Sequence, residues 1–268
     1  MTRDRERDVA TASQAVVDGA TVDTATGRLA ESDISSQRVH SIFSRIAGRY
    51  DLFNQLSSMG IYRLWLKRVV RIAAARPNDR MLDLAAGTGD VSFAIASQSA
   101  TPPASIRVTD FCQEMLDVAQ QRYEAGAAGG VPCSFQVVDA QDIPFEDGSA
   151  DLITCAYGVR NFPDRHKALE EAFRVLAPGG RYVILEFSTP PFAPWRVLYH
   201  AYLRVMIPLI GGILTGDRSG FVYLNDSIRA FPDQRTLARA LESVGFTQVT
   251  WKNCSGGIAA IHSAVKPQ

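Results

Sequence analysis

The chain has 268 residues and a mass of 29.2 kDa, which fits one large domain or one domain with an appendage. Hydrophobic residues make up 46% and charged residues 21%, so the chain can build a core and wholesale disorder is excluded. The 28 Lys and Arg residues equal the 28 Asp and Glu residues in number, which disfavours nonspecific binding to nucleic acid.

The chain is expected to begin with an extension and a helical cap. Residues 1–33 are charged at the start and then rich in Ala, Thr, Ser and Asp, which predicts a flexible extension. No apolar segment typical of a secretory signal follows the charged start, so we expect a cytoplasmic protein. Residues 34–268 form one predicted domain, and its first part, residues 34–75, is the helical cap.

From Arg80 onward, short strands alternate with helices, a pattern typical of βαβ units around a parallel sheet. Pro178-Gly179-Gly180 is a strong helix breaker and is predicted to separate the third of these helices from the fifth strand. The strands are expected over Arg80–Leu84, Ile106–Thr109, Cys133–Val138, Leu152–Ala156 and Arg181–Phe187, and the helices over Asp90–Ser97, Gln113–Glu124 and Arg165–Leu176.

The C-terminal region predicts an antiparallel edge to this sheet. A helix over Thr236–Ser243 is expected to end at Gly245. Two further strands, Phe246–Asn253 and Ile258–Lys266, flank Ser255-Gly256-Gly257 and are expected to pair as a hairpin.

An insert at residues 189–232 separates the fifth and sixth predicted strands. Together with the cap it is placed to cover the carboxyl ends of the strands, where open α/β sheets bind ligands. Its most apolar window, Val205–Gly216, has 12 residues, whereas a membrane-spanning helix needs about 20. Apolar residues recur at helical spacing, which fits either a lid that touches an apolar ligand and a membrane surface or an amphipathic helix packed on the sheet. They are Trp195, Leu198, Tyr202, Val205 and Leu209.

The cysteines give no sign of a disulfide framework or a zinc site. They lie far apart and include no CxxC pair, which fits a reducing compartment. They are Cys112, Cys133, Cys155 and Cys254. We accordingly expect no metal site.

The turn after the first predicted strand carries Gly87 and Gly89 on either side of Thr88. These glycines let the backbone turn sharply and approach a ligand with the amide groups of a helix N-terminus. A dinucleotide fingerprint needs a third glycine at position 92, which is Ser92, so NAD is disfavoured. The alternative is a glycine-rich turn without a ligand.

Carboxylates accompany this turn. Asp83 lies in the strand that leads into it, and Asp110 ends the second strand, 21 residues after Gly89. A carboxylate at the latter position can accept hydrogen bonds from both hydroxyls of an adenosine ribose. The arrangement resembles the S-adenosylmethionine site of class I methyltransferases. The resemblance implies a Rossmann-like, mostly parallel seven-stranded sheet whose glycine turn holds the amino-acid end of the cofactor.

Other strand ends extend the same resemblance. Asp139 and the amide of Ala140 are expected to face the adenine edge, although Asp139 fits a turn cap equally well. Ala156 ends the fourth strand, near the methionine end of the cofactor that the resemblance implies, and Tyr157 directly follows it.

Four further segments resemble the quinone C-methyltransferases of menaquinone and ubiquinone biosynthesis. The resemblance covers about residues 37–267. Two departures from the family pattern are Tyr62, where a histidine is usual, and Ala156, which removes a hydroxyl. The segments are Tyr50–Leu56 with Gly60–Trp65, Gly158–Asn161, Arg174–Gly180 with Leu185–Ser188, and Tyr223–Leu224 with Ser227–Ile228 and Phe231–Pro232.

This resemblance implies methylation of a ring carbon in a reduced polyprenyl quinone, with demethylmenaquinol favoured as substrate. Arg160 is then the expected partner of the ring oxyanion, because a guanidinium stays charged at any working pH. Asn161 is expected to bind the second ring oxygen, and Tyr50 and Tyr157 to lie near the sulfonium or the ring. The alternatives are a surface pair of Arg160 with Asp164 and simple core packing of Tyr157.

The proton acceptor stays open among Asp139, His166 and His200. Rival functions are methylation of the ubiquinone precursor, methylation of another lipid-like acceptor, and a noncatalytic cofactor-binding scaffold. A peripheral membrane contact and a homodimer are both compatible with the sequence, and no nucleic-acid partner is expected.

Overall fold

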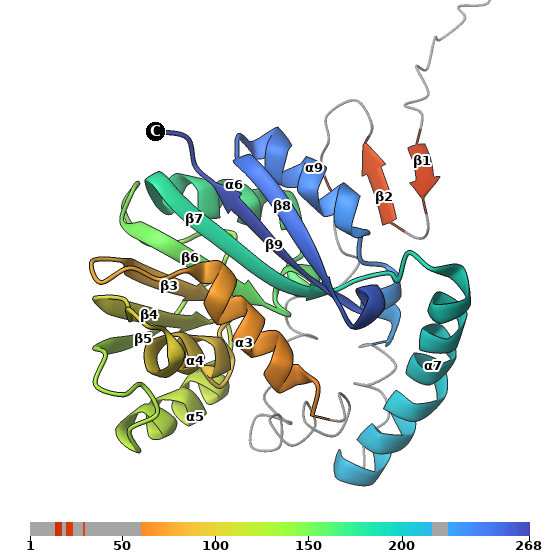
Figure 1. Cartoon of the computed structure of the whole chain (residues 1–268), viewed down its shortest axis with the longest axis horizontal. Coiled ribbons are helices and arrows are strands. Elements are labelled where there is room, and N and C mark those ends of the chain that lie inside the picture. The colour runs from red at the N-terminus through yellow and green to blue at the C-terminus, as the bar shows by residue number, and fades with distance from the viewer. Residues whose placement is uncertain (1–13, 18–19, 24–28, 30–59, 216–224) are drawn as a thin grey trace, which may run out of the picture.

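The computed structural model describes residues 14–17, 20–23, 29, 60–215 and 225–268, and it describes side chains at residues 29, 60–205 and 225–268. Its main feature is a seven-stranded sheet with the order β5-β4-β3-β6-β7-β9-β8 (Figure 1). The strands are β3 (Arg80–Leu84), β4 (Ser105–Asp110), β5 (Cys133–Val137), β6 (Ala150–Ala156), β7 (Leu176–Phe187), β8 (Thr247–Cys254) and β9 (Ala259–Val265).

Strand β9 runs antiparallel to both β7 and β8, and the other neighbours pair in parallel. The predicted mostly parallel sheet with an antiparallel C-terminal hairpin is therefore confirmed. From β3 the chain adds β4 and β5 on one side and later β6 on the other. The order reverses next to β3, and open α/β sheets bind ligands beyond the carboxyl ends of the strands at such a point.

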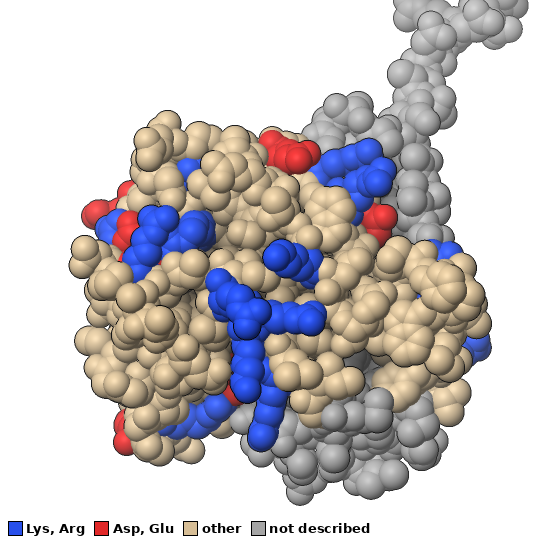
Figure 2. Space-filling model, viewed as in Figure 1, with Lys and Arg blue, Asp and Glu red and all other residues tan. Residues whose placement is uncertain are grey.

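Helices cover both faces of the sheet because its central strands are apolar on both sides. Met81 packs in the core beneath α3, α4 and α5, whereas Leu82 and Leu84 pack in a second core beneath α6 and α9. Figure 2, in the view of Figure 1, shows Lys and Arg side chains over α3. The helices are α3 (Tyr62–Ala73), α4 (Asp90–Gln98), α5 (Gln113–Glu124), α6 (Arg165–Val175), α7 (Ala193–Thr215) and α9 (Gln234–Val244).

The start of β7 corrects one prediction. The Pro178-Gly179-Gly180 segment was expected to separate α6 from a strand that begins at Arg181, but β7 already begins at Leu176. The register with β6 shifts between Ala150 and Leu152, so the segment forms a bulge inside the strand. A Cβ atom on Gly180 would lie 2.7 Å from the carbonyl oxygen of Ala177, which explains the glycine there.

The outer segments are described in part. Helix α3 lies in the predicted cap and α7 in the predicted insert. In the predicted extension, β1 (Gln14–Val17) and β2 (Ala20–Asp23) form a separate antiparallel pair. Among the described helices, none is long and apolar enough to span a membrane.

Helix α7 packs through residues outside the predicted apolar stripe as well as through part of it. Tyr199 and Leu203 are 4% and 2% exposed and form a small core with Ile228. Leu198 and Val205, two members of the predicted apolar stripe, are instead 59% and 63% exposed. Two other members, Trp195 and Tyr202, are half-buried: Trp195 Nε1 donates to the carbonyl oxygen of Ser255 at 3.1 Å, and Tyr202 packs against the small core. The predicted apolar stripe therefore has both packed and exposed members.

Candidate active site

The glycine turn between β3 and α4 has the backbone that its sequence predicts. Gly87 and Gly89 have φ angles of 56° and 83°, in the left-handed region that favours glycine. At Gly87 nothing lies within 4 Å of an added Cβ, so the backbone angle explains this residue. At Gly89 an added Cβ would also lie 2.5 Å from the ring of Phe93. The turn thus brings the N-terminus of α4 to the end of β3.

Asp83 stabilises this turn through buried side-chain hydrogen bonds. Its side chain is fully buried, and its two oxygens accept hydrogen bonds from Ser92 Oγ of α4 and Thr154 Oγ1 of β6, each at 2.6 Å. Burial raises the pKa of Asp83 to about 6, although the two hydroxyl hydrogen bonds act in the opposite direction. Asp83 therefore ties the turn, the helix and the neighbouring strand together, and it does not line the cavity described next.

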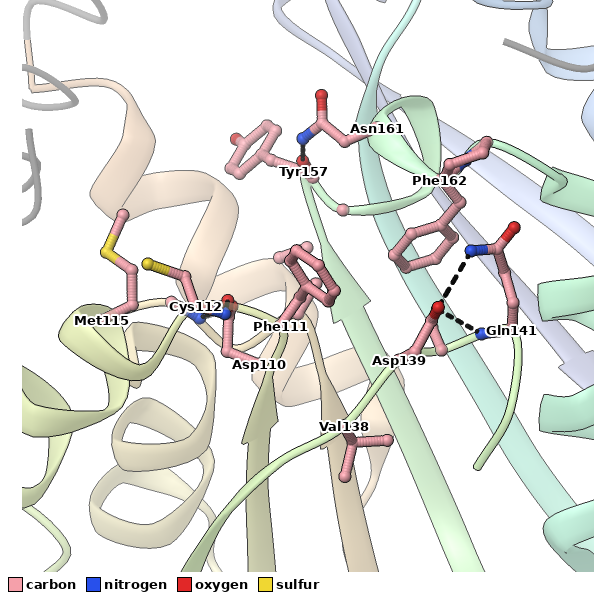
Figure 3. Close-up of a pocket in the computed structure, with 16 residues that line it drawn as sticks. Asp110, Phe111, Cys112, Met115, Val138, Asp139, Gln141, Tyr157, Asn161 and Phe162 are labelled. Carbon is pink, nitrogen blue, oxygen red and sulfur yellow. Dashed lines mark hydrogen bonds between the residues drawn. The ribbon is translucent and has the colours of Figure 1, made fainter. Parts of the chain in front are cut away.

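A cavity lies at the carboxyl ends of β3, β4 and β6 (Figure 3). Seven of the predicted site residues line it: Gly87, Asp110, Asp139, Ala140, Ala156, Tyr157 and Asn161. Thr88 and Gly89 do not. Thr88 is buried, and its carbonyl and hydroxyl oxygens accept hydrogen bonds from Arg122, whereas Gly89 caps α4.

The carboxylate of Asp110 is oriented by main-chain amides. The N–H of Gly87 donates to Oδ2 at 2.8 Å, and the N–H of Cys112 donates to Oδ1 at 2.9 Å. A carboxylate oxygen accepts more than one hydrogen bond, so both oxygens can also receive hydroxyl groups of a ligand. The site therefore presents a fixed acceptor pair at the end of β4.

Asp139 lies in the cavity wall and also closes a turn, so the two interpretations of this residue from the sequence are compatible. It lines the cavity, and its Oδ1 accepts the main-chain N–H of Gln141 at 2.9 Å and the side-chain amide at 3.0 Å (Figure 3). It thus closes an Asx turn while it faces the cavity.

Sequence reasoning missed the apolar lining of the cavity. A local signal existed for two of these residues, since Phe111 directly follows Asp110 and Met115 lies in the first turn of α5. The contribution of Phe162 had no such signal, because its place beside Asp139 depends on the loop after β6 (Figure 3). The missed residues that line the cavity include Phe111, Cys112, Met115, Gln141 and Phe162.

Tyr157 directly follows β6 and has a left-handed backbone, with φ of 58°. This conformation is costly for a residue with a side chain, and such residues concentrate at functional sites. Its ring centroid lies 4.7 Å from that of Phe187 and 6.2 Å from that of Tyr62. The packing of Tyr157 against aromatic neighbours and its place in the cavity wall are therefore compatible.

Arg160 is buried next to this aromatic group. It is 2% exposed, and its Nη1 donates to Glu186 Oε1 at 2.8 Å and to the carbonyl oxygen of Tyr157. The guanidinium lies 5.3 Å from the centroid of the Phe187 ring. The alternative surface pair with Asp164 is wrong, because Arg160 is buried and its ion pair is with Glu186; Asp164 instead caps α6 by accepting the N–H of Lys167.

Glu186 is the main functional candidate that the sequence reasoning overlooked. It is 1% exposed at the end of β7, and it also accepts the main-chain N–H of Phe187 at 2.8 Å. An acidic residue between Leu185 and Phe187 in an apolar strand was the available signal, because a charged side chain is almost never buried unless it is paired.

The other predicted residues differ in what the structure says of them. Asn161 lines the cavity and donates through Nδ2 to the carbonyl oxygen of Tyr157 at 3.1 Å (Figure 3). Tyr50 lies outside the described residues. His166 is buried in α6, with Nε2 3.5 Å from Glu170, and His200 is half-buried in α7. Neither histidine is among the residues that line the cavity.

No metal-binding group of three His, Cys, Asp or Glu side chains occurs in the described part of the chain.

The sheet order, the glycine turn and the acceptor at the end of β4 together define a class I methyltransferase. Solved structures share the fold. One is an S-adenosylmethionine-dependent methyltransferase from Thermotoga maritima, 16% identical with a TM-score of 0.56, and the match covers 84% of this chain and 99% of that chain. Another, from Aquifex aeolicus, is 15% identical with a TM-score of 0.54, and the match covers 75% of this chain and 88% of that one.

The chain belongs to the ubiE/COQ5 methyltransferase family, whose model matches residues 31–266. A relative from Acidiphilium cryptum, named ubiquinone/menaquinone biosynthesis C-methyltransferase, is 42% identical over 227 residues, which cover 84% of this chain and 89% of the relative. A relative of the same name from Geotalea daltonii is 40% identical over 232 residues, which cover 86% and 97%. The predicted family and the predicted cofactor, S-adenosylmethionine, are confirmed.

Proposed function

We propose that this methyltransferase acts on a ring carbon of a reduced polyprenyl quinone precursor and converts demethylmenaquinol to menaquinol. The names of its relatives refer to both menaquinone and ubiquinone biosynthesis. The observation that carries the proposal is a buried cation, Arg160, whose guanidinium lies 5.9 Å from the ring centroid of Tyr157, a residue of the cavity wall. The naphthoquinol is the favoured substrate and the benzoquinol is the alternative substrate.

The residues of the cavity fit S-adenosylmethionine. Asp110 would accept the hydroxyls of its ribose, because main-chain amides already orient both carboxylate oxygens. Phe111 and Phe162 would enclose the adenine, with Asp139 and the amide of Ala140 at its polar edge. Gly87 and Ala156 would hold the methionine part. When bound, the cofactor supplies an electrophilic methyl group on a positively charged sulfur.

The acceptor is a weak nucleophile until a phenolic oxygen next to the reacting carbon loses its proton. Arg160 would stabilise the resulting oxyanion, and this charge stabilisation is the largest single contribution in many enzymes. Its pair with Glu186 holds the guanidinium in one place, so that the charge needs little reorganisation during the reaction. Asn161 would orient the second ring oxygen through its side-chain amide.

Carbon methylation also releases the ring proton that the methyl group replaces. A guanidinium keeps its own protons at any working pH and is therefore a poor acceptor. Among the candidates from the sequence, Asp139 lines the cavity, whereas His166 and His200 do not. Because this proposal places Asp139 at the adenine, away from the reacting methyl group, we assign the ring proton to none of these three side chains and expect it to leave to water.

The test is incubation with methyl-labelled S-adenosylmethionine and a panel of demethylated naphthoquinols and benzoquinols, followed by mass measurement of the products. We expect label in the naphthoquinol ring and none when the quinones are left oxidised, because an oxidised ring has no phenolic oxygen to deprotonate. Label in benzoquinols alone would establish the ubiquinone precursor as the substrate. Label in no quinone would overturn the proposal in favour of another lipid-like acceptor or a cofactor-binding scaffold.

A further inference from the structure

Helix α3 carries an unusual distribution of charge. Its sequence, YRLWLKRVVRIA, contains four basic residues and no acidic residue. Arg63, Lys67 and Arg71 are spaced four residues apart, so they lie along one side of the helix, with Arg68 next to them. All four side chains are exposed. In a chain with equal numbers of basic and acidic residues, this helix therefore concentrates one sign of charge.

Strand β8 adds a fifth basic residue to the same side of the sheet. Lys252 is exposed and pairs with Ile261 of β9, whose side chain packs in the core beneath α3. Arg68 of α3 reaches the end of the same strand, where its Nη1 lies 3.8 Å from Cys254 Sγ. We call the five basic residues together the basic face: Arg63, Lys67, Arg68, Arg71 and Lys252.

Nearby carboxylates do not neutralise the basic face. Asp90 accepts the hydroxyl of Tyr62 at the start of α3, but its ion pair is with Arg122. Within the described residues, no ion pair joins any member of the basic face to a carboxylate. In Figure 2 the basic side chains gather in the middle of this face, whereas acidic side chains lie mostly towards its margins.

Like charges four residues apart destabilise a helix. The basic face therefore costs folding free energy, and a bound anionic partner would offset that cost. Arg63 and Arg71 are about 12 Å apart along the helix axis. A partner of the basic face must therefore carry several negative charges spread over at least this distance.

The apolar residues of α3 indicate which kind of anionic partner fits. Leu64 lies among the basic residues and is 59% exposed. Basic residues around an exposed leucine are typical of helices that lie on anionic membranes. Single-stranded nucleic acid would instead call for exposed aromatic rings on which bases stack. The aromatic residues of α3, Tyr62 and Trp65, are 8% and 5% exposed.

We infer that the basic face docks the protein on a membrane surface rich in anionic phospholipid. The inference rests on the proposed function in one respect, because a polyprenyl quinol is dissolved in the bilayer. Helix α3 connects the two sites. Its first residue, Tyr62, contacts Tyr157 of the cavity wall, so a membrane bound along α3 lies near the cavity that such a substrate must reach.

The test is co-sedimentation with vesicles of phosphatidylcholine, either alone or with about a third of phosphatidylglycerol. The test variant is Lys67→Gln/Arg71→Gln/Lys252→Gln. The matched control is Lys167→Gln/Arg235→Gln/Arg239→Gln, which removes three exposed cations from α6 and α9 on the opposite face of the sheet.

Wild-type protein is expected to bind the anionic vesicles and to lose this binding as salt is raised. Each basic residue near an anionic surface contributes about fivefold to the partition coefficient, so the test variant is expected to bind about 100-fold more weakly. The control should stay within about twofold of wild type. Equal binding of wild type to neutral and anionic vesicles, or of wild type and test variant to anionic vesicles, would overturn the inference. The inference would also be overturned if the test variant lost binding to duplex DNA at physiological salt while its binding to vesicles stayed unchanged.

Turnover separates this inference from the proposed function. With a water-soluble demethylated quinol that carries a short tail, all three proteins are expected to react equally. With a long-tailed quinol in anionic vesicles, only the test variant should slow. A protein that binds anionic vesicles through the basic face but methylates no quinol would refute the proposed function and leave the docking surface established.

Discussion

The ion pair between Arg160 and Glu186 offers the sharpest test of the proposed chemistry, provided that stability and catalysis are measured separately. Both residues are at most 2% exposed and their charged atoms are 2.8 Å apart. Removing one member of such a pair leaves an uncompensated buried charge, which typically costs about 3–5 kcal/mol of folding stability. That is a large share of the total stability of a domain, about 5–15 kcal/mol.

Arg160→Gln and Glu186→Gln should therefore each be strongly destabilised, and a lost activity in either would be ambiguous. The double variant Arg160→Gln/Glu186→Gln removes both charges and leaves two neutral amides, of which the one at position 186 has the shape of the glutamate and the one at position 160 is shorter than the arginine. We expect its unfolding free energy to lie within about 2 kcal/mol of wild type, far from the sum of the single effects, because an opposed pair of charges couples the two positions.

The assay is denaturant unfolding of all four proteins, followed by calorimetric titration with S-adenosylmethionine and turnover on the demethylated quinol. The double variant should bind the cofactor normally, because neither residue lines the cavity. Its kcat should fall about 100–1000-fold, the usual loss when an oxyanion partner is removed. A folded double variant with wild-type kcat would refute the catalytic role of Arg160 and reduce the pair to a structural one.

Three further predictions concern single residues. Asp110→Asn should weaken cofactor binding by at least tenfold in calorimetry, because it replaces a carboxylate acceptor by a neutral amide, and it should lower the unfolding free energy by no more than about 2 kcal/mol. Unchanged affinity would contradict the contact between Asp110 and the ribose. Gly180→Ala should cost about 1–3 kcal/mol in denaturant unfolding, because its Cβ would lie 2.7 Å from the Ala177 carbonyl oxygen, and a neutral effect would show that the bulge yields. Burial lowers the pKa of His262 to about 4, so this residue taken alone contributes a rise in stability of about 3 kcal/mol from pH 4 to 6.5, because the unfolded chain binds the extra proton. Asp83, with its pKa raised to about 6, acts in the opposite direction between about pH 4 and 6, so wild type should show a nearly flat profile, His262→Gln a falling one and Asp83→Asn a rising one. Parallel profiles for all three proteins would contradict both assignments.

The sequence by itself determined the local elements and the family. The predicted bounds of β3 and α5 agree with the structure because apolar periodicity and chain breakers are properties of neighbouring residues. The glycine turn was equally local, since the left-handed backbone of Gly87 and Gly89 is a preference of single residues. Asp110 was found because it ends a strand, where a parallel sheet places its ligand contacts.

The tertiary structure decided which chemical groups meet. Glu186 is 26 positions from Arg160, and only the adjacency of β6 and β7 brings the carboxylate to the guanidinium. Asp83 is a residue of the same strand and turn that the sequence pointed to, yet strand alternation directs its side chain towards Ser92 rather than the cavity. Local preference specifies the backbone path, whereas the order of strands in a sheet specifies the neighbours of each side chain, and the charge environment of a site depends on those neighbours.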